Sequence, residues 1–118
     1  MDDCKLSKEE CVPCNGKTPA LTKAQRKYYL QQVPDWQVID GIERDGELML
    51  VRAFEFETFA KAVAFIKQMA NIAEQKNHHP TYLHRYKEVR VHFQTYVIKN
   101  LSKNDFILAA LIDEIVVQ

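Results

Sequence analysis

The chain contains little glycine and little serine, and each shortage excludes a class of chemistry. Its only glycines are Gly16, Gly41 and Gly46, and none lies where an expected strand would pass into a helix. A glycine-rich phosphate-binding loop is therefore excluded. The two serines, Ser7 and Ser102, lie near the N-terminus and at the start of an expected helix. We therefore expect no serine nucleophile.

The sequence also lacks an excess of charge and a long apolar run. Its 118 residues carry 16 basic and 16 acidic side chains, which gives a formal net charge of zero. Binding through nucleic-acid phosphates favours a basic surface, and a membrane-spanning helix needs about 20 apolar residues, so we expect neither partner. With 47% apolar residues the chain can bury one core. We expect a cytoplasmic protein that binds a small molecule or another protein.

Cysteine is confined to the first fourteen residues, at Cys4, Cys11 and Cys14. Cys11 and Cys14 have the CxxC spacing of a zinc knuckle, but a structural zinc site needs four ligands and no second CxxC follows. We therefore expect no metal site. Residues 1–20 are interpreted as an extended, loosely held lead-in, and residues 21–118 as a single domain.

The hydrophobic periodicity predicts three helices and four strands. Thr22 and Gln25 have the spacing of a capping box, and Asp45-Gly46 favours a tight hairpin turn. Antiparallel strand pairs with helices on one face predict an α+β fold, a two-layer sandwich with a four-stranded antiparallel sheet and the order α-β-β-α-β-β-α. The expected elements are helix 22–32, strands 36–39 and 47–56, helix 58–77, strands 81–86 and 88–96, and a helix from 102 to the C-terminus.

The helix predicted over 58–77 carries an unusually wide apolar arc. One sheet covers only one side of a helix, so the remainder of the arc predicts contact with a second copy of the chain, in a homodimer or homotetramer. The predicted stripe consists of Phe59, Val63, Ile66, Ala70 and Ala73, extended by Phe65, Met69 and Ile72.

The strand predicted over 88–96 alternates between apolar and polar residues. Val89, Val91, Phe93 and Thr95 are expected to face the core. Their neighbours, Arg90, His92, Gln94 and Tyr96, would form a polar face available for chemistry.

All four histidines lie between positions 78 and 92, and two of them are adjacent. His78 and His79 precede Pro80 at the predicted end of the long helix. Glu74 lies one turn before His78, where its carboxylate would orient the ring. Because Pro80 favours an extended backbone at His79, the two rings should diverge. On spacing alone, the pair could equally complement the helix dipole.

These residues resemble the signature of the pterin-4a-carbinolamine dehydratase family, in its bacterial form. The resemblance covers nearly the whole chain and includes the CVPC segment. It rests on Glu74-x3-His78-His79-Pro80-x5-Tyr86-x9-Tyr96-x8-Asp105, and on Pro34-Asp35-Trp36, Phe54-Glu-Phe56, Phe59, Ala62, Leu101-Ser102 and Asn104-Asp105-Phe106.

One position departs from the family pattern. The third histidine of the family would fall at position 96, where this chain has Tyr96. Asp105 follows at the family distance, so the difference is a substitution and not a shift of register. His92 cannot replace the missing ring, because four strand residues separate it from position 96 by about 13 Å.

The resemblance implies a hydro-lyase, a 4a-hydroxytetrahydrobiopterin dehydratase. Water is lost from 4a-hydroxytetrahydropterin to give quinonoid dihydropterin, in the recycling that serves aromatic amino acid hydroxylases. An acid protonates the leaving hydroxyl and a base takes the N5 proton, without a metal or redox cofactor. Catalytic roles would fall to His78, His79, Tyr96 and Asp105. Substrate binding would fall to Glu74, Asn77, His78, His79, Pro80, Gln94, Thr95, Tyr96 and Val97.

The residues leave some assignments open. Histidine has a pKa near 6.5 and suits either proton transfer, so the acid and the base are not distinguished. Tyr96, with a pKa near 10, can donate a hydrogen bond but is a poor base at neutral pH, which predicts a slower enzyme. Asp105 is equally interpretable as a first-turn helix acid. Two other functions are a non-catalytic pterin- or protein-binding oligomer that acts as an assembly or stabilising factor, and a metal hydrolase built on the histidines.

Overall fold

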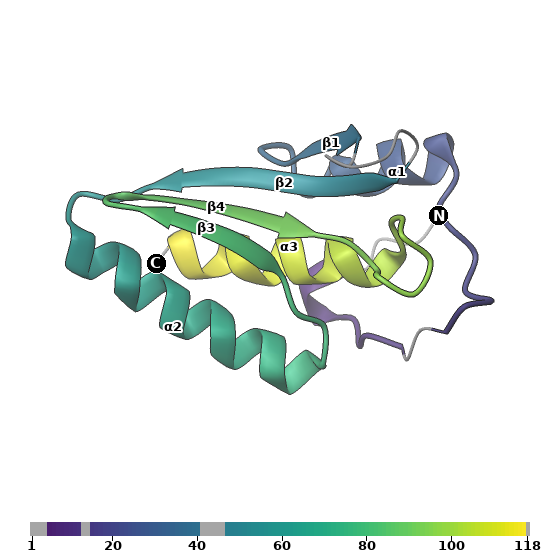
Figure 1. Cartoon of the computed structure of the whole chain (residues 1–118). Helices are drawn as coiled ribbons and strands as arrows, with labels where there is room; N and C mark the ends of the chain where they lie inside the picture. The colour runs from purple at the N-terminus through teal and green to yellow at the C-terminus, as the bar shows by residue number, and fades with distance from the viewer. Residues whose placement is uncertain (1–4, 13–14, 41–46, 118) are drawn as a thin grey trace.

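Four antiparallel strands form one sheet, and two long helices lie against one of its faces (Figure 1). The computed structural model describes residues 5–12, 15–40 and 47–117. The strand order is β1-β2-β4-β3. The predicted α+β fold and its element order are confirmed. In chain order the elements are η1 (Leu6–Lys8), α1 (Lys23–Leu30), β1 (Gln37–Asp40), β2 (Leu48–Glu55), α2 (Phe59–Lys76), β3 (Thr81–Arg85), β4 (Glu88–Phe93) and α3 (Lys103–Val117).

Local signals place the helix ends as predicted. The Thr22 hydroxyl accepts a bond from the Gln25 N–H, and the Gln25 side chain accepts one from the Thr22 N–H, which completes the capping box of α1. The predicted Asp45-Gly46 turn lies outside the described residues. In the part of the chain that the structure describes, no helix combines the length and the hydropathy needed to cross a bilayer.

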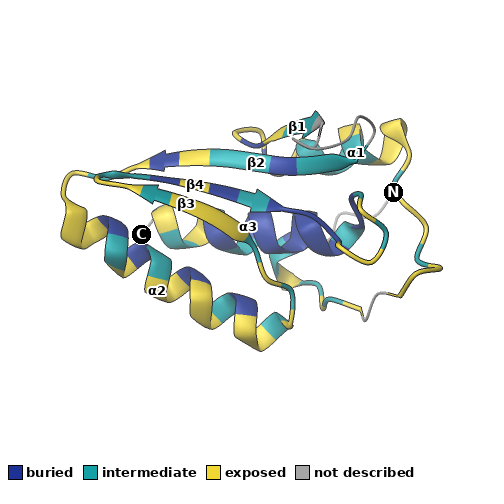
Figure 2. Ribbon diagram, viewed as in Figure 1, coloured by how far each residue is buried: buried dark blue, intermediate teal, exposed yellow. Residues whose placement is uncertain are grey.

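The core lies between the sheet and the helices. Figure 2 shows buried residues concentrated on β4 and the first half of α3, with further ones along one side of α2 and at Leu50 and Phe54 of β2. The alternation predicted for β4 is confirmed, since Val89, Val91 and Phe93 are fully buried and Thr95 nearly so. The strand ends at Phe93, earlier than predicted, because a turn closed by Thr95 and Asn100 follows.

The apolar arc predicted for α2 is confirmed in part. Phe65, Met69 and Ala73 are buried as predicted, but Phe59 and Ala70 are exposed, and Ala62 is buried although the predicted arc does not include it. The complete buried set is Ala62, Phe65, Met69 and Ala73.

Residues 6–12 are packed against the fold, in contrast to the loosely held lead-in that the sequence predicts over residues 1–20. Leu6 is fully buried, and its N–H donates to the Gln32 side chain at 2.9 Å. Leu6–Lys8 forms a short 3₁₀ helix packed against α3. We call residues 6–12 the N-terminal strap. Its position brings the beginning of the chain beside the functional residues.

Arg52, the one charged residue on the inner face of β2, is explained by a carboxylate on α3. Its guanidinium donates to Asp113 at 2.7 Å, and the Trp36 indole N–H donates to the same oxygen at 2.7 Å. Burial raises the pKa of Asp113, while the Trp36 hydrogen bond and the Arg52 charge act against that rise.

Replacing Arg52 by Met should therefore destabilise the fold by an amount that depends on pH. At pH 7 the Asp113 carboxylate loses its cation while half-buried, and we expect a loss of about 1–3 kcal/mol in the free energy of unfolding. A carboxyl whose pKa is raised in the folded state favours folding at low pH and loses that contribution as pH rises. The loss in Arg52→Met should therefore be smaller at pH 4, as measured by urea denaturation at both pH values.

Asp35→Ala is the matched control, because Asp35 is the exposed carboxylate on the other side of Arg52, at 3.6 Å. A surface pair of this kind contributes little, so its removal should change stability by less than about 1 kcal/mol. An equal loss in Arg52→Met at pH 4 and pH 7 would contradict the role given to Asp113.

Candidate active site

The end of α2 aims His78 at the start of α3. Asn77 adopts the left-handed conformation, with φ 51° and ψ 43°, and its N–H bonds back to the Glu74 carbonyl. The His78 N–H bonds to the Ala73 carbonyl. This is a Schellman closure, in which asparagine is one of the few residues tolerated at the left-handed position. The helix thus stops and the chain turns inward at His78.

His78 is held by Asp105 and not by Glu74. Its Nε2 lies 2.6 Å from Asp105 Oδ1, and its ring stacks on Phe93 with centroids 6.2 Å apart. Glu74 instead lies 3.5 Å from His79 Nε2, and is mostly exposed. The predicted contact between Glu74 and His78 is wrong, because α2 ends before position 78 and the turn at Asn77 carries His78 away from that helix face.

Asp105 is fully buried at the first turn of α3 and accepts three hydrogen bonds. Besides His78, they come from the Thr95 hydroxyl at 2.8 Å and the Ser102 N–H at 2.9 Å, both to Oδ2. With Asp105 ionised, the carboxylate can only accept, and the proton of this hydrogen bond lies on His78 Nε2. The hydrogen bond therefore fixes the tautomer of a neutral His78 and leaves Nδ1 for proton transfer.

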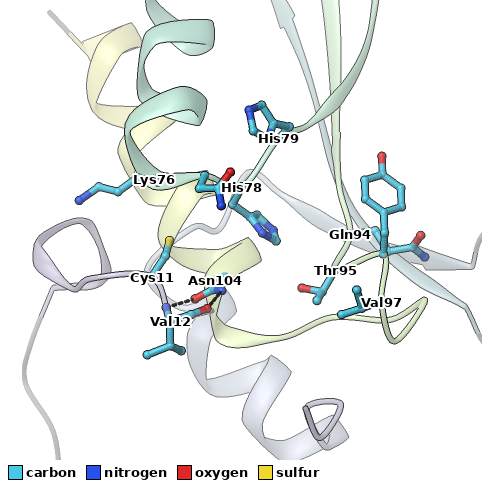
Figure 3. Close-up of a pocket in the computed structure, with 11 residues that line it drawn as sticks. Cys11, Val12, Lys76, His78, His79, Gln94, Thr95, Val97 and Asn104 are labelled. Atoms are coloured by element: carbon cyan, nitrogen blue, oxygen red, sulfur yellow. Dashed lines mark hydrogen bonds between the residues drawn. The ribbon is translucent and has the colours of Figure 1, made fainter. Parts of the chain in front are cut away.

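His78 and His79 open onto a cavity of about 450 Å³, which is within the range of small-molecule sites. Figure 3 shows its lining, in which the two rings point in different directions, as predicted. The lining residues are Cys11, Val12, Lys76, Asn77, His78, His79, Gln94, Thr95, Tyr96, Val97 and Asn104.

Seven of the predicted site residues thus line one cavity, and three do not. Asp105 lies beneath His78, so it positions that ring and does not reach the cavity. Glu74 and Pro80 lie outside the lining. Sequence reasoning missed Cys11, Val12, Lys76 and Asn104. The resemblance gave a signal for Cys11 and Val12 in the CVPC segment, and for Asn104 in the motif that opens α3, but none for Lys76.

Tyr96 lies in the turn after β4, with 55% of its surface exposed. Its hydroxyl is 2.6 Å from the Thr81 hydroxyl at the start of β3. The position at which the resemblance predicts a third histidine thus carries a phenol that is hydrogen-bonded and lines the cavity.

The other two histidines do not reach the cavity. His84 Nε2 bonds to the Tyr86 carbonyl at 2.8 Å. His92 lies in the sheet, where burial and the nearby Arg90 lower its pKa. Of the polar face predicted over 88–96, Gln94 and Tyr96 line the cavity, whereas Arg90 and His92 do not, because β4 ends at Phe93 and the site lies beyond that end. Among the described residues, no three side chains of His, Cys, Asp or Glu gather as a metal site would require.

The family model "Pterin 4 alpha carbinolamine dehydratase" matches residues 19–115. The chain belongs to this family.

Its similarity to members of the pterin-4a-carbinolamine dehydratase family extends over nearly the full length. A protein of Marinobacter nauticus is 39% identical over 93% of this chain and 96% of its own length. One of Methylococcus capsulatus is 37% identical over 98% of this chain and 96% of its own length. Both carry the provisional name pterin-4-alpha-carbinolamine dehydratase.

Two solved structures share the fold. The transcriptional coactivator/pterin dehydratase of Brucella melitensis has a TM-score of 0.73 and 29% identity, over 82% of this chain and 98% of that one. A pterin dehydratase-like protein described as a RuBisCO assembly factor in the alpha-carboxysome has a TM-score of 0.55 and 20% identity, over 68% of this chain and 87% of that one. The second likeness extends to the fold alone.

Replacing Asp105 by Asn should allow the proton of a neutral His78 ring to lie on either nitrogen, instead of on Nε2 alone. An amide has one acceptor oxygen in place of two, so either the His78 N–H or the Ser102 N–H would face another donor. We expect a loss of about 1–3 kcal/mol in the free energy of unfolding and a larger Nδ1–H population of His78. Chemical denaturation and ¹⁵N NMR of the imidazole rings measure the two effects.

His84 provides the internal control, because its ring bonds to the Tyr86 carbonyl and not to Asp105. Its tautomer should stay the same in Asp105→Asn. An unchanged His78 spectrum would show that the carboxylate does not set the proton position.

Proposed function

We propose that the chain dehydrates 4a-hydroxytetrahydropterin to quinonoid dihydropterin in cytoplasmic pterin recycling. The observation that carries this proposal is the His78 ring, held by the buried Asp105 and opening with His79 onto one cavity. Membership of the family supports the substrate class.

His78 would perform one of the two proton transfers. The N–H of Nε2 is engaged by Asp105 at 2.6 Å, so Nδ1 exchanges the proton with substrate. As a neutral ring with Nδ1 unprotonated, it would serve as the base for N5. The imidazolium that results is stabilised by the carboxylate, as in other histidine–carboxylate pairs.

His79 would bind and polarise the pterin. Its side chain is half-exposed and lies 3.5 Å from the Glu74 carboxylate, so a ring N–H can donate to a pterin oxygen or nitrogen. Asp105 would act through His78 as a positioning residue, since it does not line the cavity.

Tyr96 would assist the departing hydroxyl. Its phenol lies within hydrogen-bond distance of the Thr81 hydroxyl and can donate a hydrogen bond, but a phenol is a poorer acid–base group at neutral pH than an imidazole. We therefore propose a member of the family whose rate is reduced at this step, while substrate binding is retained.

The test is the rate of dehydration of freshly generated carbinolamine. The wild-type protein should accelerate the reaction over buffer, and Tyr96→His should raise kcat about tenfold or more, because it restores an acid–base group. Asp105→Asn should lower kcat by about 10²-fold or more, by analogy with loss of the carboxylate in other histidine pairs. No acceleration by either the wild type or Tyr96→His would reject the proposal.

Tyr86→Phe is the matched control for these variants. Tyr86 is an exposed tyrosine in the turn between β3 and β4, and it does not line the cavity. Its replacement should leave kcat and KM unchanged.

The second candidate function is a non-catalytic oligomer that binds a pterin or a protein and stabilises or assembles a partner. Tyr96 favours it, together with the apolar side chains of Phe59, Tyr82 and Leu83, which are exposed on α2 and β3. The same surface could be covered in a homodimer or homotetramer, and an aromatic amino acid hydroxylase is a partner class consistent with pterin recycling.

Calorimetric titration with a dihydropterin and capture of partners from lysate separate the two functions. Turnover with no stable partner supports the enzyme. Tight capture of one defined partner with negligible turnover supports the assembly factor. Light scattering at micromolar concentration measures the oligomeric state, and a monomer would contradict the proposed self-association.

A further inference from the structure

One wall of the cavity is formed by residues that precede the match to the family model, although the similarity to individual family members extends over nearly the full length. Cys11 and Val12 of the N-terminal strap line the cavity, whereas the family match begins at residue 19. Figure 3 shows these two residues on one side of His78, and Thr95 and Val97 on the other. The strap therefore helps to set the width of the cavity.

A buried amide fixes the strap at the cavity. The Val12 N–H donates to Asn104 Oδ1 at 3.1 Å, and Asn104 Nδ2 donates to the Val12 carbonyl at 2.6 Å (Figure 3). Asn104 is only 3% exposed, while Val12 is 65% exposed. Apolar contacts alone would suffice for a segment whose role is to cover the core. Here two hydrogen bonds hold the backbone of the exposed Val12, and they therefore fix the position of the Val12 side chain.

The remainder of the strap is anchored at successive points. Leu6 is fully buried in the core. Glu9 forms an ion pair with Lys103 on α3, and Glu10 lies 3.4 Å from Lys76, itself a lining residue at the end of α2. These contacts join the strap to both helices that carry the site.

Asn104 and Asp105 are consecutive residues of one helical turn. The first holds the strap through Val12, and the second holds His78. The separation between the strap and the reactive ring is thus determined by the first turn of α3.

We propose that the N-terminal strap is the wall that selects the size of the pterin, with Cys11 and Val12 in contact with bound substrate and Asn104 as its positioning residue. This inference rests on the proposed function for the identity of the ligand. The reacting edge of the pterin, C4a and N5, must face His78, so the substituent on the adjacent C6 extends past that ring toward a neighbouring wall. The Cys11 thiol and the Val12 isopropyl group would contact that substituent, so the space that they leave limits its size.

Binding titrations test the wall without depending on turnover. Two 7,8-dihydropterins are used, one with a methyl group at C6 and one with a dihydroxypropyl group. Val12→Trp should weaken binding of the larger pterin about tenfold or more and of the smaller one by less than about threefold. Asn104→Ala should remove most of the wild-type difference in affinity between the two pterins, because the wall is no longer held.

Val116→Trp is the matched control, since it places the same bulk on an exposed valine near the end of α3, outside the cavity lining. It should leave both affinities unchanged. Circular dichroism shows whether each variant is folded. The proposal would be overturned if Val12→Trp bound each pterin with the same affinity as the wild type, or if it weakened the binding of both pterins by the same factor.

The native chain offers a second measurement. Iodoacetamide alkylation of Cys11 is followed by peptide mass spectrometry with and without the larger dihydropterin. At a ligand concentration ten times the Kd, the reaction at Cys11 should slow by about tenfold, because the thiol is covered in the complex. An unchanged rate at saturation would overturn the contact.

Failure of the wall and failure of the proposed function give different results. A wild-type protein that binds dihydropterins with the predicted variant effects, yet does not accelerate dehydration, supports the wall and rejects the enzyme. Turnover without any effect of Val12→Trp or any protection of Cys11 rejects the wall alone. No binding of either pterin rejects both.

Discussion

The carboxylate of Asp105 is the group on which both the fold and the site depend. It accepts bonds from His78 after α2, Thr95 after β4 and Ser102 at the start of α3. An ionised carboxylate is costly to bury without donors, and the N-terminus of a helix favours negative charge. Three elements distant in the sequence therefore converge on one anion, and the cavity forms where they meet. The structural and the functional interpretations of Asp105 are thus two descriptions of one arrangement.

Much of the fold could be predicted because its signals are local. The capping pair Thr22 and Gln25, and the alternation from Val89 to Phe93, depend on neighbouring residues and on the fixed periods of helix and strand. The sequence resemblance similarly selected His78 and Tyr96 for the cavity. Composition alone would not have separated these residues from His84 and His92, which lie outside the cavity.

The parts that could not be predicted depend on distant contacts. The partner of His78 lies 27 positions away, whereas the nearer Glu74 would be aligned with it only if α2 continued beyond Lys76. The strap has no periodicity, and its bonds to Gln32 and Asn104 join residues 26 and 92 positions apart. Such contacts depend on the surface that the sheet and α3 form together, which no local pattern in the sequence describes.

The left-handed turn at Asn77 shows that the direction of a reactive ring can be encoded in a residue with no part in proton transfer. A β-branched residue at that position would be strained at positive φ and would redirect the chain, so the imidazole would no longer reach its carboxylate. Glycine would keep the turn. The range of residues tolerated between a helix and its histidine is therefore set by backbone geometry, and a substitution at Asn77 could reorient this ring without changing either the imidazole or its carboxylate.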